Sequence, residues 1–336
     1  MNTLEMNLTS IALFLFCHKN SFYVSVIAFS FMLRTTTAIF WIPLVLFDLL
    51  VRVKPSKFIR KMLPQALLVP ILVTLVDSFF YGEFTFVPWN FTKINILHGI
   101  SVQYGVHPWH WYTYSFLIPV AGIIGIFYMC KGVSNVFKFG SDVSKMIIVS
   151  TILTFVIYSI LAHKEHRFMI PLTPMILAMM AIGKEKNDKF VDIFCLGNII
   201  VGLYFSMIHQ GAPHAIMRYL SSKTEVKGVL FLTHCHATPF YSDFHRDIPM
   251  RALECPPDLN GVKMPKEADL FDEKPLEWTK KEVDLKLYDH VVLFDKDEVL
   301  KDYLEENELR LCEKFFHTHF GEHHNAAYLL IYCRNK

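Results

Sequence analysis

Hydrophobic residues are gathered into long runs over the first 209 residues of the chain, and short polar segments separate these runs. Several runs approach the roughly 20 apolar residues that a helix needs to cross a bilayer. The pattern therefore predicts an α-helical, polytopic membrane protein with roughly seven or eight membrane segments. The first three runs are short, so those helices could be paired, re-entrant or tilted. The runs are 6–16, 22–33, 38–51, 62–80, 114–130, 146–162, 168–182 and 190–208.

The polar segments between the runs differ in their content of Lys and Arg, and this predicts an orientation. Segment 52–61 is the most basic, and cytoplasmic loops carry an excess of Lys and Arg, so we place it in the cytosol. Alternation then puts the lysine-bearing segments 131–145 and 184–189 on the same side. Segments 81–113 and 163–167 fall on the opposite, lumenal side. Segment 163–167 is basic although it is translocated, which indicates a task for its charge, such as holding an anion.

Residues 210–336 are polar and predict a separate small α/β domain, which the same alternation places in the lumen. Short apolar runs at 229–232, 291–294 and 328–332 predict buried strands. The predicted organisation is a membrane domain at 1–209, with the lumenal loop 81–113, followed by the lumenal domain at 210–336.

Two further features of this domain carry predictions. Residues 297–310 are expected to form a helix, with Leu300, Leu304 and Leu311 spaced for one face. Four of the seven cysteines also lie in the domain, and an oxidising lumen permits disulfides, but the spacing does not say which residues pair. These cysteines are Cys235, Cys255, Cys312 and Cys333.

Composition supports the membrane class and narrows the function. Hydrophobic residues make up 53% of the chain, and the mean hydropathy is +0.32, which is high for a water-soluble protein. The formal net charge is only +2, so nothing in the charge balance indicates a nucleic-acid partner. The cysteines show no spacing typical of a zinc site, and we expect neither a metal nor a cofactor.

Segment 163–168 is the strongest candidate for chemistry. It joins His163, Lys164, Glu165, His166 and Arg167 between two apolar runs. Arg offers a two-pronged donor for phosphate and Lys a point charge, and His163 and His166 could also donate to phosphate. The alternative is a solvated hairpin tip whose long cationic side chains reach the membrane surface. The residues alone leave these two readings equally open.

Loop 81–113 is the second candidate. Aromatic and imidazole side chains alternate there, among them His107, Trp109 and His110. Aromatic residues at this place are typical of the belt at a membrane surface. Two interleaved histidines favour a groove instead, in which rings stack on sugar and histidines donate hydrogen bonds. Arg34 follows a helix on the same side and either faces an anion pocket or anchors the helix end.

Three histidine pairs in the C-terminal domain are a third candidate, for metal binding. Their spacing matches no metal site, so an ordinary polar surface is the favoured interpretation. The pairs are His234 and His236, His317 and His319, and His323 and His324.

These segments together resemble a known family. His163, Lys164, Glu165, Arg167 and Phe168 match the His-Lys-Glu-x-Arg-Phe signature of the membrane mannosyltransferases that use dolichyl-phosphate mannose, glycosyltransferase family 22. Stretches 77–112 and 235–258 resemble the branch of this family that adds the third mannose to the glycosylphosphatidylinositol (GPI) anchor precursor.

The resemblance implies a GT-C-like fold in the endoplasmic reticulum membrane, with the active site at the lumenal face. It implies α-1,2 transfer of mannose from dolichyl-phosphate mannose to the mannosylated GPI precursor, among membrane lipids and without a cofactor. It also implies that His163, Lys164 and Arg167 contact the donor phosphate, and that His107, Trp109 and His110 line the substrate groove. Cations near a phosphate leaving group stabilise the charge that develops on it.

The chain departs from the family in one respect. The family's catalytic acids lie in a first lumenal loop behind an N-terminal helix, and segment 2–5 resembles sequence that follows that loop. We therefore expect an incomplete GT-C-like fold, lacking an N-terminal part, and the catalytic base is unknown. The alternative function is an inactive isoform or a non-catalytic membrane protein.

Overall fold

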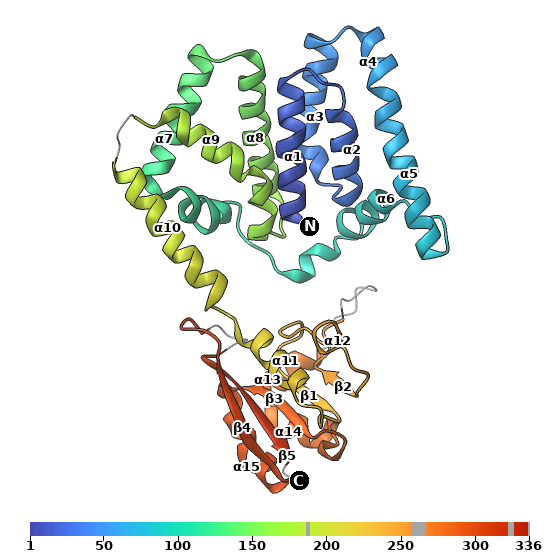
Figure 1. Ribbon diagram of the computed structural model, residues 1–336, viewed down its shortest axis with the longest axis vertical. Helices are drawn as coiled ribbons and strands as arrows, with labels where there is room; N and C mark the ends of the chain where they lie inside the picture. Colours follow the sequence, from blue (N-terminus) through green and yellow to red (C-terminus); the bar gives the residue numbers. More distant parts are fainter. Residues whose placement is uncertain (186–188, 257–265, 322–325, 335–336) are drawn as a thin grey trace. The chain divides into compact units, whose positions relative to one another are not determined.

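The structure is a computed structural model that describes residues 1–185, 189–256, 266–321 and 326–334. The chain forms two compact units, Met1–Cys195 and Leu196–Lys336 (Figure 1). The first unit is helical, and the second contains a five-stranded sheet with helices around it. A helical membrane protein with a small C-terminal α/β domain is thus confirmed.

Each of the eight apolar runs is helical in the structure. Proline stands in the first turn of several of the helices, where its missing N–H costs no hydrogen bond. Gly82 ends α5 with a φ of 74°, a left-handed conformation that glycine adopts without strain. The helices are α1 (Asn2–Cys17), α2 (Tyr23–Leu33), α3 (Thr37–Phe47), α4 (Pro55–Lys61), α5 (Leu63–Tyr81), α6 (Val87–Thr92), α7 (Ile118–Phe139), α8 (Asp142–Ile160), α9 (Thr173–Gly183) and α10 (Lys189–Met207).

Five helical stretches among the described residues are long and apolar enough to cross a membrane, which is fewer than the seven or eight predicted. The difference lies in the N-terminal helices, since α2 and α3 have 11 residues each. Such a helix is about 16 Å long, about half the thickness of the hydrocarbon core. The five stretches are Pro55–Tyr81, Thr113–Phe139, Asp142–Ile160, His166–Gly183 and Asp192–Ser222.

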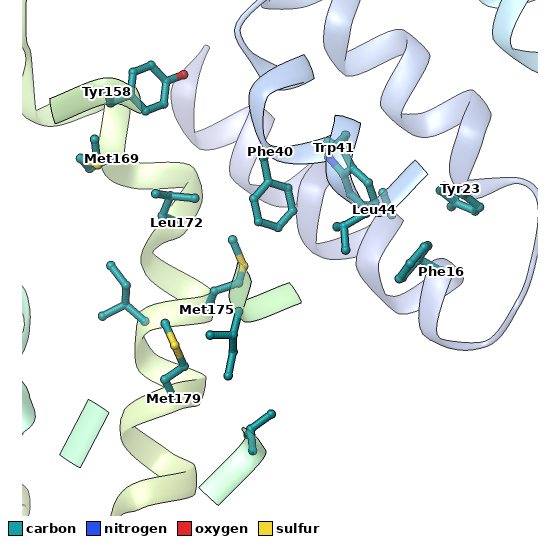
Figure 2. Close-up of a cluster of buried hydrophobic side chains, with 14 of the residues drawn as sticks. Phe16, Tyr23, Phe40, Trp41, Leu44, Tyr158, Met169, Leu172, Met175 and Met179 are labelled. Atoms are coloured by element: carbon teal, nitrogen blue, oxygen red, sulfur yellow. The ribbon is translucent and has the colours of Figure 1, made fainter. Parts of the chain in front are cut away.

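The core of the first unit joins its N-terminal helices to α9. Phe16, Tyr23 and Trp41 pack as an aromatic group with ring centroids 5.3 to 6.2 Å apart. Figure 2 shows this group on one side of the core, with Met175 and Met179 along α9 on the other. The unbranched methionines fill the irregular space between helices. Residues of α1, α2 and α8 all contribute to this core, and the candidate site lies at the start of α1, the end of α2 and the end of α8.

The sheet of the second unit has the strand order β2-β1-β3-β5-β4. Strands β2, β1 and β3 are parallel, and β5 runs antiparallel to β3 and β4. Hydrophobic clusters cover both faces, which explains why the central strands are continuous apolar runs. The strands are β1 (Val229–Leu232), β2 (Met250–Ala252), β3 (His290–Phe294), β4 (Leu309–Phe316) and β5 (Tyr328–Arg334), and the helices are α11 (Ala212–Ser222), α12 (Tyr241–Phe244), α13 (Glu267–Glu273), α14 (Pro275–Glu282) and α15 (Lys301–Glu306).

The three predicted strands are confirmed as β1, β3 and β5, but the helix predicted over 297–310 is partly wrong. A 3-10 turn at Asp295–Leu300 leads into α15, which ends at Glu306. Glu308 then takes a left-handed φ of 64° and turns the chain into β4. Leu300 and Leu304 are buried as expected, whereas Leu311 is on the strand and 51% exposed.

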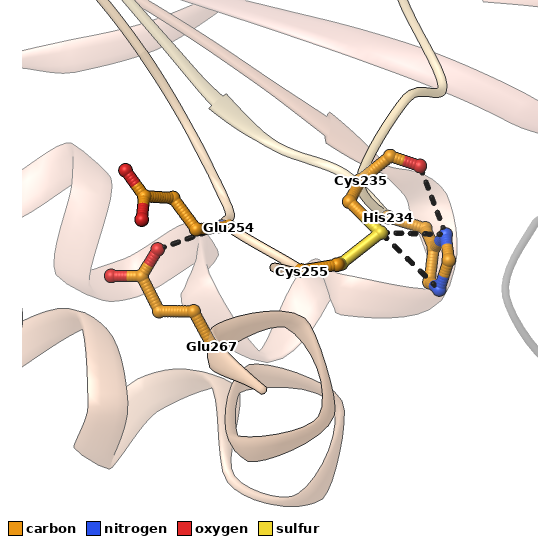
Figure 3. The surroundings of a disulfide bond; sticks show 5 residues. All are labelled: His234, Cys235, Glu254, Cys255 and Glu267. Atoms are coloured by element: carbon orange, nitrogen blue, oxygen red, sulfur yellow. Dashed lines mark hydrogen bonds between the residues drawn. A yellow bond between two sulfur atoms is a disulfide. The ribbon is translucent and has the colours of Figure 1, made fainter. Parts of the chain in front are cut away.

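Two disulfides stabilise the second unit, a pairing that the sequence left open. Cys235, after β1, bonds to Cys255, after the neighbouring strand β2 (Figure 3). Cys312 in β4 bonds to Cys333 in the adjacent β5. Each closes a loop of about 20 residues, which contributes about 3 kcal/mol by restricting the unfolded chain.

Candidate functional site

Segment 163–167 links the end of α8 to the 3-10 turn at His166–Leu172 that leads into α9. Lys164 anchors the segment from within. Its side chain is 3% exposed, and its ammonium group donates hydrogen bonds to the carbonyl oxygens of His107, at 2.8 Å, and of Leu161. Burial lowers the pKa of Lys164 below its usual value. Lys164 therefore fixes segment 163–167 against the loop that contains His107.

Glu165 pairs with the two basic side chains beside it, Arg167 and His163. Arg167 donates from Nη2 to Oε1 at 2.8 Å and also pairs through Nε, and Nε2 of His163 lies 3.0 Å from Oε1. Burial alone would raise the pKa of Glu165, but the hydrogen bonds from Arg167 and His163 outweigh it and hold the pKa below the usual range. Glu165 is thus a carboxylate at neutral pH that positions both side chains.

The ring of His163 is bonded on both sides. Nδ1 lies 3.0 Å from the carbonyl oxygen of Gly105, and Nε2 faces Glu165. These two contacts fix the plane of the imidazole ring between Gly105 and Glu165.

Tyr112 holds the backbone of the same segment. It is fully buried, its phenol donates to the carbonyl oxygen of Glu165 at 3.1 Å, and it accepts from the amide of Glu165 at 3.1 Å. Burial raises the pKa of Tyr112 far above neutrality, so the phenol stays protonated. Nothing in the sequence pattern singles out this residue from the other aromatic residues of the loop.

The start of α1 and the end of α2 meet this segment. Arg34 donates from Nη1 to Glu5 at 2.7 Å and to Asn2 at 2.6 Å. Its guanidinium lies 5.4 Å from the ring centroid of Phe168, and Asn2 donates to the carbonyl oxygen of Arg167 at 2.7 Å. Three segments far apart in the sequence thus form one cluster. Arg34 anchors the end of α2 through Asn2 and Glu5, and it also lines a cavity; that this cavity holds an anion stays a prediction.

A cavity of about 820 Å³ opens at this cluster. Its charged side chains are Arg34, His163, Glu165 and Arg167. Most of the other lining groups are apolar or aromatic, as is usual for a site that holds a mostly apolar ligand and orients it with few polar groups. They include Phe91, Tyr104, Tyr158, Leu161 and Phe168, together with the polar Asn95 and Ser101.

The residues predicted for a substrate groove lie beside this cavity rather than among its lining residues. His107 stacks on Trp111, with ring centroids 4.3 Å apart, and its amide donates to Ala162 at 3.1 Å. Trp109 is 72% exposed and meets His110 edge to face. Of the six predicted site residues, His163 and Arg167 line the cavity. Lys164 and His107 do not line it: Lys164 donates to the carbonyl oxygen of His107, and the amide of His107 donates to Ala162, next to segment 163–167.

One group of described residues brings possible metal ligands close together. In this group His234 lies with Cys235 and Cys255, with possible ligand atoms within 4.8 Å of each other. The two sulfurs are bonded to each other, so neither is a thiolate ligand, and Nδ1 of His234 lies 3.1 Å from the carbonyl oxygen of Cys235 (Figure 3). His323 and His324 lie outside the described residues.

The fold and the cavity define a polytopic helical membrane protein with cationic groups beside a largely apolar cavity. The sequence profile of the Alg9-like mannosyltransferase family matches residues 1–245, and the chain belongs to this family. It is similar over 99% of its length to proteins named GPI alpha-1,2-mannosyltransferase 3 from Danio rerio, at 33% identity, and from Homo sapiens, at 30%. GPI mannosyltransferase 3 of Candida albicans is 30% identical over the same share of the chain.

The chain spans about two thirds of the length of these relatives, namely 65%, 63% and 71%. No solved structure matches the chain.

Proposed function

We propose that the protein transfers mannose in an α-1,2 linkage from dolichyl-phosphate mannose to the mannosylated GPI precursor, as the third mannose of the anchor. The observation that carries this proposal is the cavity whose wall combines Arg34, His163 and Arg167 with apolar and aromatic side chains. Such a wall suits a lipid-linked sugar phosphate, because the cations face the phosphate and the apolar surface accepts the isoprenyl chain and sugar ring.

In the proposed reaction, a hydroxyl oxygen of the acceptor mannose bonds to C1 of the donor mannose, and the bond from C1 to the phosphate oxygen breaks. The hydroxyl proton leaves to a base, and dolichyl phosphate departs with one more negative charge. Arg167 stabilises this charge as it develops, and His163 lines the same wall. Glu165 positions Arg167 and His163 and is not the base, because its oxygens are bonded to them.

We place the site and the C-terminal domain at 210–336 in the lumen of the endoplasmic reticulum. The basic segment 52–61 supports this orientation through the positive-inside rule. The two disulfides of the second unit also support it, since such bonds persist in an oxidising compartment.

Rescue of cells that lack the third-mannose step tests the proposal. Expression of the protein should restore GPI-anchored proteins at the cell surface, and Arg167→Ala should abolish the rescue. Arg60→Ala, a change of the same kind in exposed α4, should rescue like the wild type. Failure of the wild type at normal expression would refute the proposed activity, and full rescue by Arg167→Ala would refute the role of that residue.

A further inference from the structure

Arg34 is a cationic group of the cavity that keeps unused hydrogen-bond donors on a largely buried side chain. Its side chain is 15% exposed and lines the cavity, so it is neither fully buried nor free in solvent. Both of its recorded hydrogen bonds, to Asn2 and Glu5, leave from Nη1. Nε and Nη2 bond to none of the residues that the structure describes. The edge of the guanidinium formed by Nε and Nη2 is therefore available to donate hydrogen bonds to a ligand.

The other basic groups of the site are less well prepared to bind a ligand. Arg167 pairs with Glu165 through Nε and Nη2, which leaves Nη1 on a side chain that is 64% exposed, and both ring nitrogens of His163 are bonded. Lys164 does not line the cavity and donates to backbone carbonyls. Among these basic residues, Arg34 is thus the one that is largely buried and can bind a ligand through Nε and Nη2 together without breaking a bond of its own.

Its orientation is fixed by buried partners. Glu5 is 5% exposed, and its second oxygen accepts from the hydroxyl of Thr37 at 2.7 Å, so the carboxylate cannot turn away. The ring of Phe168 packs beneath the guanidinium. Asn2 and Glu5 hold one edge of the Arg34 guanidinium, and Phe168 packs against its face. The free edge therefore points in a fixed direction, which reduces the conformational entropy lost when a ligand binds.

We infer that Arg34 contacts the phosphate of an isoprenyl-phosphate ligand through Nε and Nη2, with Glu5 and Asn2 as its positioning residues. The inference rests on the proposed function and adds a phosphate contact from α2 to those of segment 163–167. In this arrangement Arg34 contacts the phosphate, whereas the buried Lys164 donates to backbone carbonyl oxygens.

The test compares a charged ligand with its neutral counterpart. Citronellyl phosphate and citronellol share an isoprenoid chain, and their dissociation constants are measured on the purified full chain in detergent. The wild type should prefer the phosphate. Arg34→Gln should reduce this preference at least tenfold and leave the affinity for citronellol unchanged. Arg34→Lys, which keeps the charge without the fork, should show a smaller loss, and Arg60→Gln should match the wild type.

The outcomes separate the inference from the proposed function. A wild-type chain that does not prefer the phosphate would overturn the proposed function together with the inference. A wild-type preference that Arg34→Gln retains would overturn the inference alone. If Arg34→Gln also loses citronellol binding, its fold has changed and Arg34→Lys decides: at least a threefold loss of preference supports the contact, and an unchanged preference overturns it.

Discussion

Helices α7 and α9 approach each other at two glycines, and an added methyl group there should destabilise the protein. A Cβ atom on Gly132 would lie 1.9 Å from the carbonyl oxygen of Met179, and one on Gly183 would lie 1.9 Å from the carbonyl oxygen of Tyr128. The obstructing atoms belong to the backbone, so no side chain can rotate out of the way. Small residues permit such close contact between membrane helices, where packing rather than the hydrophobic effect holds them together.

The magnitude follows from the geometry. A carbon and a carbonyl oxygen normally approach to about 3.3 Å, so Gly132→Ala would push the helices apart by about 1.4 Å. Overpacking of this kind costs about 1–3 kcal/mol, and more if the contact around Met179 and Met180 is lost. In an open helix the same substitution is favourable by up to about 1 kcal/mol, because alanine has the higher helix propensity. A glycine-to-alanine substitution therefore destabilises the protein where the added Cβ meets a neighbouring helix, and it stabilises the protein where the position is open.

Thermal unfolding of the purified protein in detergent measures this effect. Gly132→Ala should lower the Tm by roughly 2–8 °C. Gly202→Ala in α10 is the matched control, since a Cβ there meets nothing within 4 Å, and its Tm should be unchanged or higher. A Gly132→Ala protein as stable as the control would show that α7 and α9 do not pack in this way.

Three further predictions concern single side chains. Glu165→Gln removes the charge that holds Arg167 and His163, so the initial rate of mannose transfer should fall about tenfold or more; a rate within twofold of the wild type would contradict the positioning role. Asp297 is 4% exposed, and burial raises its pKa to about 7. The folded state therefore favours the protonated acid, and its stability falls as the pH rises from about 4 through 7, by about 4 kcal/mol in all. Asp297→Asn should remove this loss, so that its advantage over the wild type in unfolding experiments grows with pH, and parallel pH curves would contradict it. Tyr112→Phe should cost about 1 kcal/mol of unfolding free energy through the lost phenol bonds to Glu165, which a lowered Tm would report.

The sequence predicts the helices well because each apolar run carries its own signal. Membrane helices and buried strands need continuous apolar residues, so the eight runs and strands β1, β3 and β5 could be located without a structure. Strand β4 was missed because Leu300, Leu304 and Leu311 imitate a helical face, while the turn at Glu308 depends on a backbone angle that composition does not reveal.

The candidate site was only partly predictable. The cluster at 163–168 is visible because its charges are adjacent in the chain. The destinations of its side chains depend on distant segments: Lys164 is buried against His107, 57 residues away, and Asn2 meets the backbone of Arg167, 165 residues away. Pairs such as Arg34 and Glu5 leave no periodic pattern, so they become visible only when the helices are packed.

We propose that this chain uses the cavity at Arg34, His163 and Arg167 to transfer mannose from an isoprenyl phosphate. Transfer by the purified chain in proteoliposomes, with radiolabelled dolichyl-phosphate mannose and a GPI precursor that carries two mannoses, measures this activity directly. The wild type should form a product larger by one hexose that α-1,2-mannosidase shortens again, and Arg167→Ala should form none. A monodisperse wild-type preparation that binds citronellyl phosphate and forms no such product would contradict it.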